Sequence, residues 1–146
     1  MADFLKDIAN YLTPKIKTFV FNALGELEIE VEPKKLFKLI IILKEDEKLA
    51  FEQLIDITAI DYPEEEKRFK VVYHFLTIKY NQRLRVVTYV NDEEQIKSIT
   101  SIYPHANWYE REIFDMFGIG FADHPDMRRI LTDYDFKGHP LRKDYV

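Results

Sequence analysis

The stretch from Asn107 to Tyr145 reads NWYEREIFDMFGIGFADHPDMRRILTDYDFKGHPLRKDY, and within it a regular pattern gives way to an irregular one. Its first part predicts a helix, because apolar side chains recur at the spacing of one helical face, at Tyr109, Ile113 and Met116. Asn107 and Glu110 fit a capping box at the start of this helix, and Gly118 fits the C-terminal cap.

The periodicity stops after Phe121. Residues 123–146 contain five acidic and five strongly basic residues, so their charges cancel. Apolar residues recur there without a helical or strand period, at Met127, Ile130, Leu131, Tyr134, Phe136, Leu141 and Tyr145. Such a segment cannot bury its own apolar groups, yet it is too rich in them for a plain linker. We therefore predict a globular domain over residues 1–121 and an extended partner-binding arm over residues 122–146.

The composition narrows the possible classes of protein. A chain of 146 residues with 47% hydrophobic residues can form one domain with a real core. Its net charge of −5 and the absence of a basic stripe argue against nucleic-acid binding. The longest apolar run, Leu39–Leu43, is too short for a membrane span. The chain has no cysteine, which excludes disulfides, thiolate zinc sites and cysteine-ligated iron–sulfur clusters within it.

Before the arm, the pattern predicts alternating helices and strands. Helices are expected at residues 3–12, at 33–44, where Pro33 fits the first turn, and at 92–102, where Asp92 and Gln95 form a second capping box. Strands are expected at residues 17–21, 26–32, 54–60, 69–80 and 83–90. This order predicts an α+β fold, with a mainly antiparallel sheet and helices packed on one face.

Candidate catalytic and metal-ligating residues are few. His124, Asp126 and His139 could form a metal site and make the chain a small metal-dependent enzyme, although His-Pro-Asp is also turn chemistry. Glu110 and Glu112 do not suggest an acid–base pair, because residues two apart on a helix point in different directions. The sequence contains no phosphate-binding glycine loop and no local catalytic triad. We therefore predict no catalytic, metal or cofactor-binding residue in this chain.

The charges of the arm suggest an interface instead. Its basic residues are interleaved with aromatic and aliphatic side chains, and include Arg128, Arg129, Arg142 and Lys143. Interfaces use this mixture, with buried apolar anchors beside arginines that bind carboxylates.

One known family shares these motifs. The runs in question are Glu110-Arg111-Glu112, Asp115-Met116-Phe117-Gly118, His124-Pro125-Asp126, Arg128-Arg129-Ile130-Leu131 and Gly138-His139-Pro140-Leu141-Arg142-Lys143-Asp144. They closely resemble the thirty-kilodalton subunit, also called the C subunit, of proton-pumping NADH-quinone oxidoreductase, respiratory complex I. The part before residue 100 resembles that family more loosely, through its order of elements.

The resemblance implies a structural subunit of the peripheral arm of that complex, which braces the quinone-site and cluster-bearing subunits. It implies the D subunit and other peripheral-arm subunits of complex I as partners. FMN, iron–sulfur clusters and quinone would belong to the parent complex and not to this chain. The residues expected at partner contacts are Glu110, Arg111, Glu112, His124, Arg128, Arg129, Leu131, Phe136, His139, Leu141, Arg142 and Lys143.

The resemblance also implies a cellular location for the protein, and it leaves two alternative functions open. The expected location is the cytoplasmic side of a bacterial inner membrane, as a peripheral protein, and the acidic N-terminus matches neither a signal nor a transit peptide. The alternative functions are the equivalent subunit of a membrane-bound hydrogenase or of another quinone-linked dehydrogenase.

Overall fold

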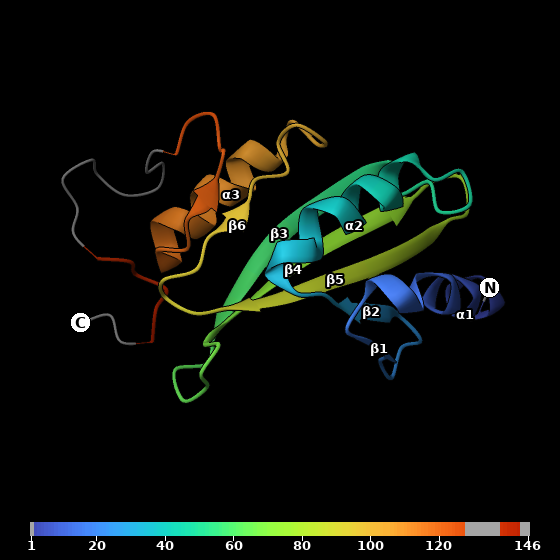
Figure 1. The fold of residues 1–146 in the computed structure, drawn as a ribbon, viewed down its shortest axis with the longest axis horizontal. Helices are drawn as coiled ribbons and strands as arrows, with labels where there is room; N and C mark the ends of the chain where they lie inside the picture. Colours follow the sequence, from blue (N-terminus) through green and yellow to red (C-terminus); the bar gives the residue numbers. More distant parts are fainter. Residues whose placement is uncertain (1, 128–137, 144–146) are drawn as a thin grey trace.

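The computed structural model of the chain describes residues 2–127 and 138–143 (Figure 1). Its longer elements are the helices α1 (Ala2–Leu12), α2 (Pro33–Glu45) and α3 (Ala106–Phe117) and the strands β3 (Gln53–Asp61), β4 (Phe69–Thr77) and β5 (Gln82–Val90). Shorter elements are the strands β1 (Thr18–Phe21), β2 (Leu27–Glu30), β6 (Ile96–Lys97) and β7 (Phe121–Ala122) and a 3₁₀ turn, η1 (Thr13–Lys15).

The main sheet has five strands in the order β1-β2-β5-β4-β3. Three of its pairings are antiparallel, and β2 pairs with β5 in parallel. A parallel pair needs a crossover connection, which α2, β3 and β4 provide here. The α+β prediction is thus confirmed, with a sheet that is mixed and mostly antiparallel.

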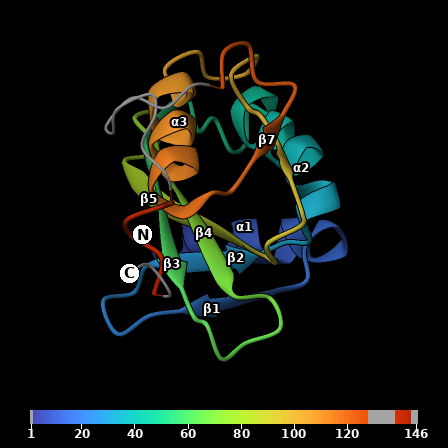
Figure 2. The same cartoon turned by 90° about the vertical axis from the view of Figure 1, so that its left-hand side faces the viewer.

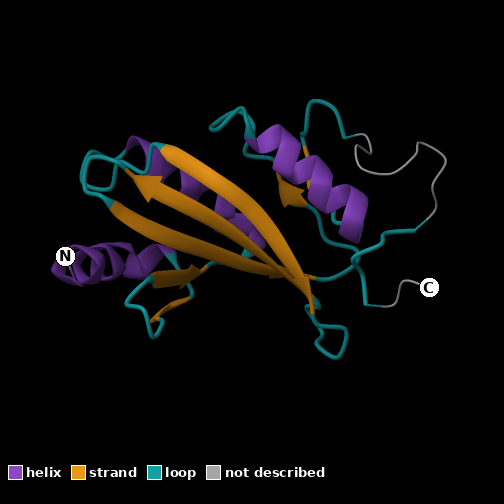
Figure 3. Ribbon diagram, turned by 180° about the vertical axis from the view of Figure 1, so that it is seen from behind, coloured by secondary structure: helices purple, strands orange, loops and turns teal. Residues whose placement is uncertain are grey.

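One hydrophobic core joins the sheet to the helices. Figure 2 shows α2 and α3 on the same side of the sheet. The buried sides of α1, α2 and α3 and the inward side chains of the strands belong to one cluster, which includes Leu12, Ile29, Leu36, Tyr73 and Ile113. Along the sheet, α1 lies at one end of the molecule and α3 at the other (Figure 3). The helices therefore cover one face of the sheet, and α3 marks the end where the chain leaves it.

The other face of the sheet is polar. Glu28 lies opposite Arg85, Arg85 opposite His74, and His74 opposite Asp56, so one row of charged and titratable side chains crosses four strands. This row agrees with the alternation of residues 26–32, which predicts one wet face. Ion pairs link side chains along this row, such as Arg85 with Glu28 at 3.5 Å.

The predicted helix at residues 92–102 is wrong. The Asn91 side-chain oxygen accepts hydrogen bonds from the Glu93 and Glu94 N–H groups, which makes a turn in place of a first helical turn. The chain then forms β6, whose Ile96 N–H bonds to the Gly120 carbonyl in a parallel pairing with β7. The apolar residues that suggested a helix by their spacing of three are Ile96, Ile99 and Ile102. They are buried on β6 and in the turns after it, so their spacing reflects burial and not a helix.

The predicted cap at the start of α3 is also wrong. The helix begins at Ala106, its N-cap is His105, and no side chain caps it. Glu110 does not reach back to Asn107, because its carboxylate points inward and is buried. The predicted C-terminal cap is confirmed: Gly118 has a φ of 80° and its N–H bonds to the Phe114 carbonyl.

Candidate partner-binding site

Residues 138–143 return to the domain and cap the end of α3. The last carbonyls of a helix lack partners within the helix and need donors from elsewhere. The Leu141 N–H donates to the Met116 carbonyl at 2.9 Å, and the His139 Nδ1 donates to the Asp115 carbonyl at 2.8 Å. Residue 118 packs against the His139 ring and has to be a glycine, because a Cβ on Gly118 would lie 2.8 Å from that ring.

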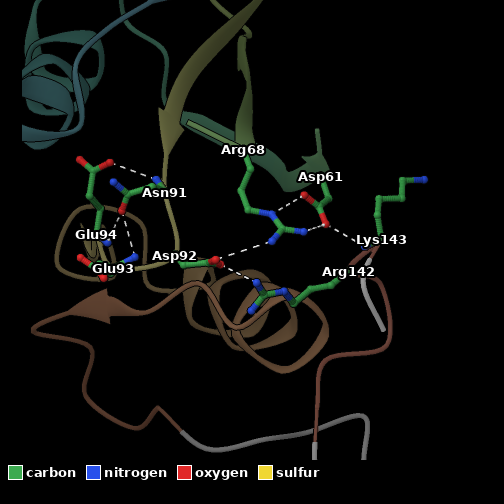
Figure 4. Close-up of polar contacts among 8 residues, drawn as sticks. All are labelled: Asp61, Arg68, Asn91, Asp92, Glu93, Glu94, Arg142 and Lys143. Atoms are coloured by element: carbon green, nitrogen blue, oxygen red, sulfur yellow. Dashed lines mark hydrogen bonds and ion pairs between the residues drawn. The ribbon is translucent and has the colours of Figure 1, made fainter. Parts of the chain in front are cut away.

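Next to this cap, four charged side chains join the end of the sheet to the returning segment (Figure 4). Arg68, at the start of β4, donates two hydrogen bonds to Asp61, at the end of β3, at 2.8 and 2.6 Å. Arg142 binds Asp92 at 2.5 Å, and Asp92 also lies 3.6 Å from Arg68. The Lys143 N–H donates to Asp61 at 2.7 Å, so both aspartates hold the segment.

The Asp61–Arg68 pair of this network is shielded from water, which strengthens it, whereas the Asp92 side chain is 48% exposed. The Asp61 side chain is fully buried and that of Arg68 is 14% exposed. The guanidinium carbons of Arg68 and Arg142 both lie about 5 Å from the centre of the Phe69 ring, at 5.0 and 5.2 Å. Burial alone would raise the pKa of Asp61, but the hydrogen bonds from Arg68 and the Lys143 N–H hold that pKa below its usual value.

A second polar cluster lies beneath α3. Glu110 is completely buried, and its carboxylate accepts hydrogen bonds from the Ser98 hydroxyl at 2.6 Å and from the Ile99 N–H at 2.9 Å. Burial raises the pKa of Glu110 to about 7, against the effect of these two hydrogen bonds. The His124 side chain is also fully buried, and its Nε2 lies 3.8 Å from Glu110 Oε1. The structure therefore brings two candidate residues together, in the interior of the domain.

The other candidates differ in position. Arg111 and Glu112 are partly buried on α3, while Leu141 is 53% exposed and Lys143 is exposed. His139, Arg142 and the Lys143 N–H contact the domain itself, so these groups have partners within the chain. The candidates that lie outside the described residues are Arg128, Arg129, Leu131 and Phe136.

Sequence reasoning missed the residues that receive the returning segment. The residues concerned lie at or next to strand ends: Asp61, Arg68 and Asp92. Charged side chains in such positions usually face water, so the neighbouring sequence gave no sign that these three bind residues 138–143. Asp92 was predicted as a helix cap, whereas its carboxylate binds Arg142 and lies near Arg68. Trp108, on α3, is 53% exposed.

The described residues offer no metal centre. Within residues 2–127 and 138–143, no three histidine, aspartate or glutamate side chains are grouped as metal ligands, so His124, Asp126 and His139 do not form such a group. No helix of the described part combines the length and hydrophobicity that a membrane span requires.

Comparison with known proteins places these features in a family. Residues 29–146 match the family described as respiratory-chain NADH dehydrogenase, 30 Kd subunit. The chain belongs to this family. It is also 51% identical over 150 residues to the NADH-quinone oxidoreductase C subunit of Jannaschia sp. (strain CCS1), covering 99% of this chain and 72% of that protein. The resemblance inferred from the motifs of residues 110–144 is thereby confirmed.

Solved structures agree with this assignment. The chain is similar to the trypsin-resistant fragment (1–134) of Nqo5, with a TM-score of 0.75 and 28% identity over 84% of this chain and 98% of that one. It is also similar to a chain of the membrane-bound sulfane sulfur reductase, an archaeal respiratory membrane complex. There the TM-score is 0.81 and the identity 28%, over 99% of this chain and 84% of that one. The fold of this 30 kDa subunit family is thus shared by respiratory complexes of more than one kind.

Proposed function

We propose that the chain is a structural subunit of the peripheral arm of proton-translocating NADH-quinone oxidoreductase, with no active site, flavin or iron–sulfur cluster of its own. The family match over residues 29–146 carries this proposal. The chemistry of the residues supports it. The chain has no cysteine to ligate a cluster, and the Glu110 carboxylate and His124 ring are fully buried side chains.

The proposed role is to brace the D subunit, which helps form the quinone site, and the cluster-bearing subunits beside it. Electron transfer between cofactors in different subunits requires those subunits to be held in a fixed arrangement. The end of the domain near α3 suits this task, because the Asp61–Arg68 ion pair there is shielded from water while Trp108 and Leu141 remain 53% exposed. Exposed aromatic and aliphatic side chains beside arginines are typical of interface anchors.

The proposed location follows from the same role. A peripheral-arm subunit would lie on the cytoplasmic side of a bacterial inner membrane and be attached through its partner subunits. The partner-contacting residues that we propose on the described surface are Trp108, Arg111, Glu112, Leu141 and the side chain of Lys143. In the rest of the arm we propose Arg128, Arg129, Leu131 and Phe136.

Purification from the native host tests the proposal. A tagged chain should co-purify with flavin- and cluster-containing subunits and with NADH-quinone reductase activity, while the isolated chain shows neither activity nor a visible chromophore. Deletion of the gene should remove activity from membranes together with the assembled peripheral arm. Normal activity in the deletion strain would overturn the bracing role.

A second candidate function has a specific observation in its favour. The similarity to the membrane-bound sulfane sulfur reductase covers 99% of this chain, so the same fold serves another respiratory membrane complex. In that case the chain would brace a related hydrogenase or quinone-linked dehydrogenase. Co-purification of a nickel-site subunit, without a flavin-containing NADH-oxidising subunit, would select this alternative.

A further inference from the structure

The buried cluster beneath α3 contains polar groups that the partner-binding site does not use. The Glu110 carboxylate faces Ser98 and Ile99 on one side and His124 on the other. The side chains of Glu110 and His124 are both 0% exposed. A buried pair of titratable groups is costly unless its protons are arranged to limit the charge.

The position of one proton in this pair follows from the hydrogen bonds. The Asp126 N–H donates to His124 Nδ1 at 2.9 Å, so Nδ1 carries no proton. The neutral imidazole therefore has its proton on Nε2. This Nε2–H faces Glu110 Oε1 across 3.8 Å, which is longer than a hydrogen bond. Nε2 makes no full hydrogen bond within the described residues, although the Asn107 backbone carbonyl also acts on the ring as an acceptor.

The surroundings disfavour a charge on either group. Burial lowers the pKa of His124, and the charge of Arg111 lowers it further, while the Asn107 backbone carbonyl and Asp126 act in the opposite direction. On the sheet side, the Tyr73 hydroxyl is buried without a hydrogen bond in the described part of the chain, and burial together with the Glu110 charge raises its pKa. The imidazole therefore stays neutral, and the proton that can leave near neutrality is that of Glu110.

We propose that Glu110 and His124 form one buried proton-binding site, whose occupancy sets how residues 121–127 are held against α3. With the proton bound, Glu110 is a neutral acid and the 3.8 Å gap to His124 remains. When the proton leaves, the carboxylate has two donors in the described part of the chain, Ser98 and Ile99, and attracts the Nε2–H as a third. Closing the gap to about 2.9 Å draws His124, and with it the chain that follows β7, towards α3.

This site makes the start of the arm sensitive to proton concentration. His124 lies just after β7, and Met127, the last residue described before residue 138, packs against the core. A shift of His124 by about 1 Å would therefore reposition the point at which the chain leaves the domain. The inference concerns the isolated chain and does not rest on the proposed function.

The test is a pH titration of the isolated chain between about pH 5.5 and 8.5, followed by NMR of the histidine rings. The Nε2–H resonance of His124 and the amides of residues 121–127 should shift together, with one midpoint near neutrality. In Glu110→Gln, a neutral isostere of the protonated acid, this joint transition should vanish. His74, whose Nδ1 lies 2.5 Å from Asp56 on the outer face of the sheet, serves as the internal control, and its ring resonances should be the same in both proteins at each pH.

A second variant keeps the proposal testable if Glu110→Gln does not fold. Ser98→Ala removes one donor to the carboxylate, and should raise the midpoint by about 0.5–1 unit while leaving His74 unchanged. A joint transition that survives in Glu110→Gln, an absence of any transition at His124, or an unchanged midpoint in Ser98→Ala would each overturn the proposal.

Discussion

The His139 ring occupies the space that a side chain on Gly118 would need. A Cβ added to Gly118 would lie 2.8 Å from one ring carbon of His139 and 2.9 Å from Nε2. Gly118 also has a φ of 80°, a conformation that favours glycine. Two independent constraints therefore meet at the C-terminal end of α3, one from the backbone of the helix cap and one from the segment that returns to it.

Gly118→Ala should destabilise the domain for both reasons. The left-handed conformation costs about 1–2 kcal/mol for a residue with a Cβ. Contact with the His139 ring should add about 1–3 kcal/mol or displace residues 138–143. Urea unfolding would measure the total loss of stability.

Gly25→Ala is a matched control. Gly25 has nearly the same φ, 81°, but a Cβ there would meet nothing within 4 Å. Its destabilisation should therefore contain only the backbone cost. The difference between the two variants should disappear when His139 is also replaced by alanine. Equal losses at Gly25 and Gly118 would mean that His139 does not press on the helix end.

Asp61→Asn should be strongly destabilising, because it removes the buried carboxylate that accepts two hydrogen bonds from the mostly buried Arg68 guanidinium. Removing one partner of a buried ion pair costs about 3–5 kcal/mol. Hydrogen exchange should also become faster at Leu141–Lys143, since the Lys143 N–H loses a charged acceptor. The comparison is Glu30→Gln, whose partner Lys17 is 63% exposed and where we expect a loss below about 1 kcal/mol.

Acid should release the same network. The pKa of Asp61 is lower in the folded chain than its ordinary value of 3.8. Its contribution to stability is therefore complete above that ordinary value and is lost as the pH falls through the lower pKa of the folded state. The difference in unfolding free energy between the wild type and Asp61→Asn should be constant above about pH 4 and should shrink as the pH falls below that value. Parallel curves over this range would assign the stabilisation to other groups.

Glu110 should give folding stability the opposite pH dependence from Asp61. Its pKa rises from 4.5 to about 7 on folding, so the folded chain binds the proton more tightly. The resulting stability is complete below pH 4.5 and is lost as the pH rises through about 7, with a total change of about 3 kcal/mol. Glu110→Gln should therefore be more stable than the wild type at about pH 9, and the difference should shrink towards pH 5. A difference independent of pH would contradict a buried, proton-binding carboxyl.

The sequence predicted correctly those features that depend on residues close together in the chain, and it failed where distant residues determine the structure. The alternation of residues 26–32 and the Gly118 cap were predicted correctly, since strand periodicity and helix caps are set by neighbours in sequence. The region of Ile96 was predicted wrongly, because its structure depends on pairing with β7, which lies much later in the chain. Glu110 was assigned to a local cap, but its carboxylate is used by Ser98 and Ile99 across the core. The Asp61–Arg68–Arg142 network likewise joins distant parts of the chain, and no local pattern encodes it.

The last prediction separates residues that hold the domain together from residues that bind a partner. Arg142 has an internal partner in Asp92, so Arg142→Glu places two carboxylates side by side and should lower the stability of the isolated chain. Arg128 and Arg129 lie outside the described residues, and we predict that they bind carboxylates of a neighbouring subunit. Their joint replacement by glutamate should cost about 2–5 kcal/mol at a desolvated interface, while the isolated chain keeps its melting temperature.

The two variants should therefore fail in different assays. The Arg128→Glu, Arg129→Glu double variant should fold normally but be incorporated poorly into the complex, with a matching loss of NADH-quinone reductase activity in membranes. Arg142→Glu should first show a lower melting temperature, and the reciprocal change Asp92→Arg should restore part of it, because the opposite charges again face each other. A large fall in melting temperature for the double variant, with normal incorporation, would assign Arg128 and Arg129 to the domain itself and remove them from the proposed interface.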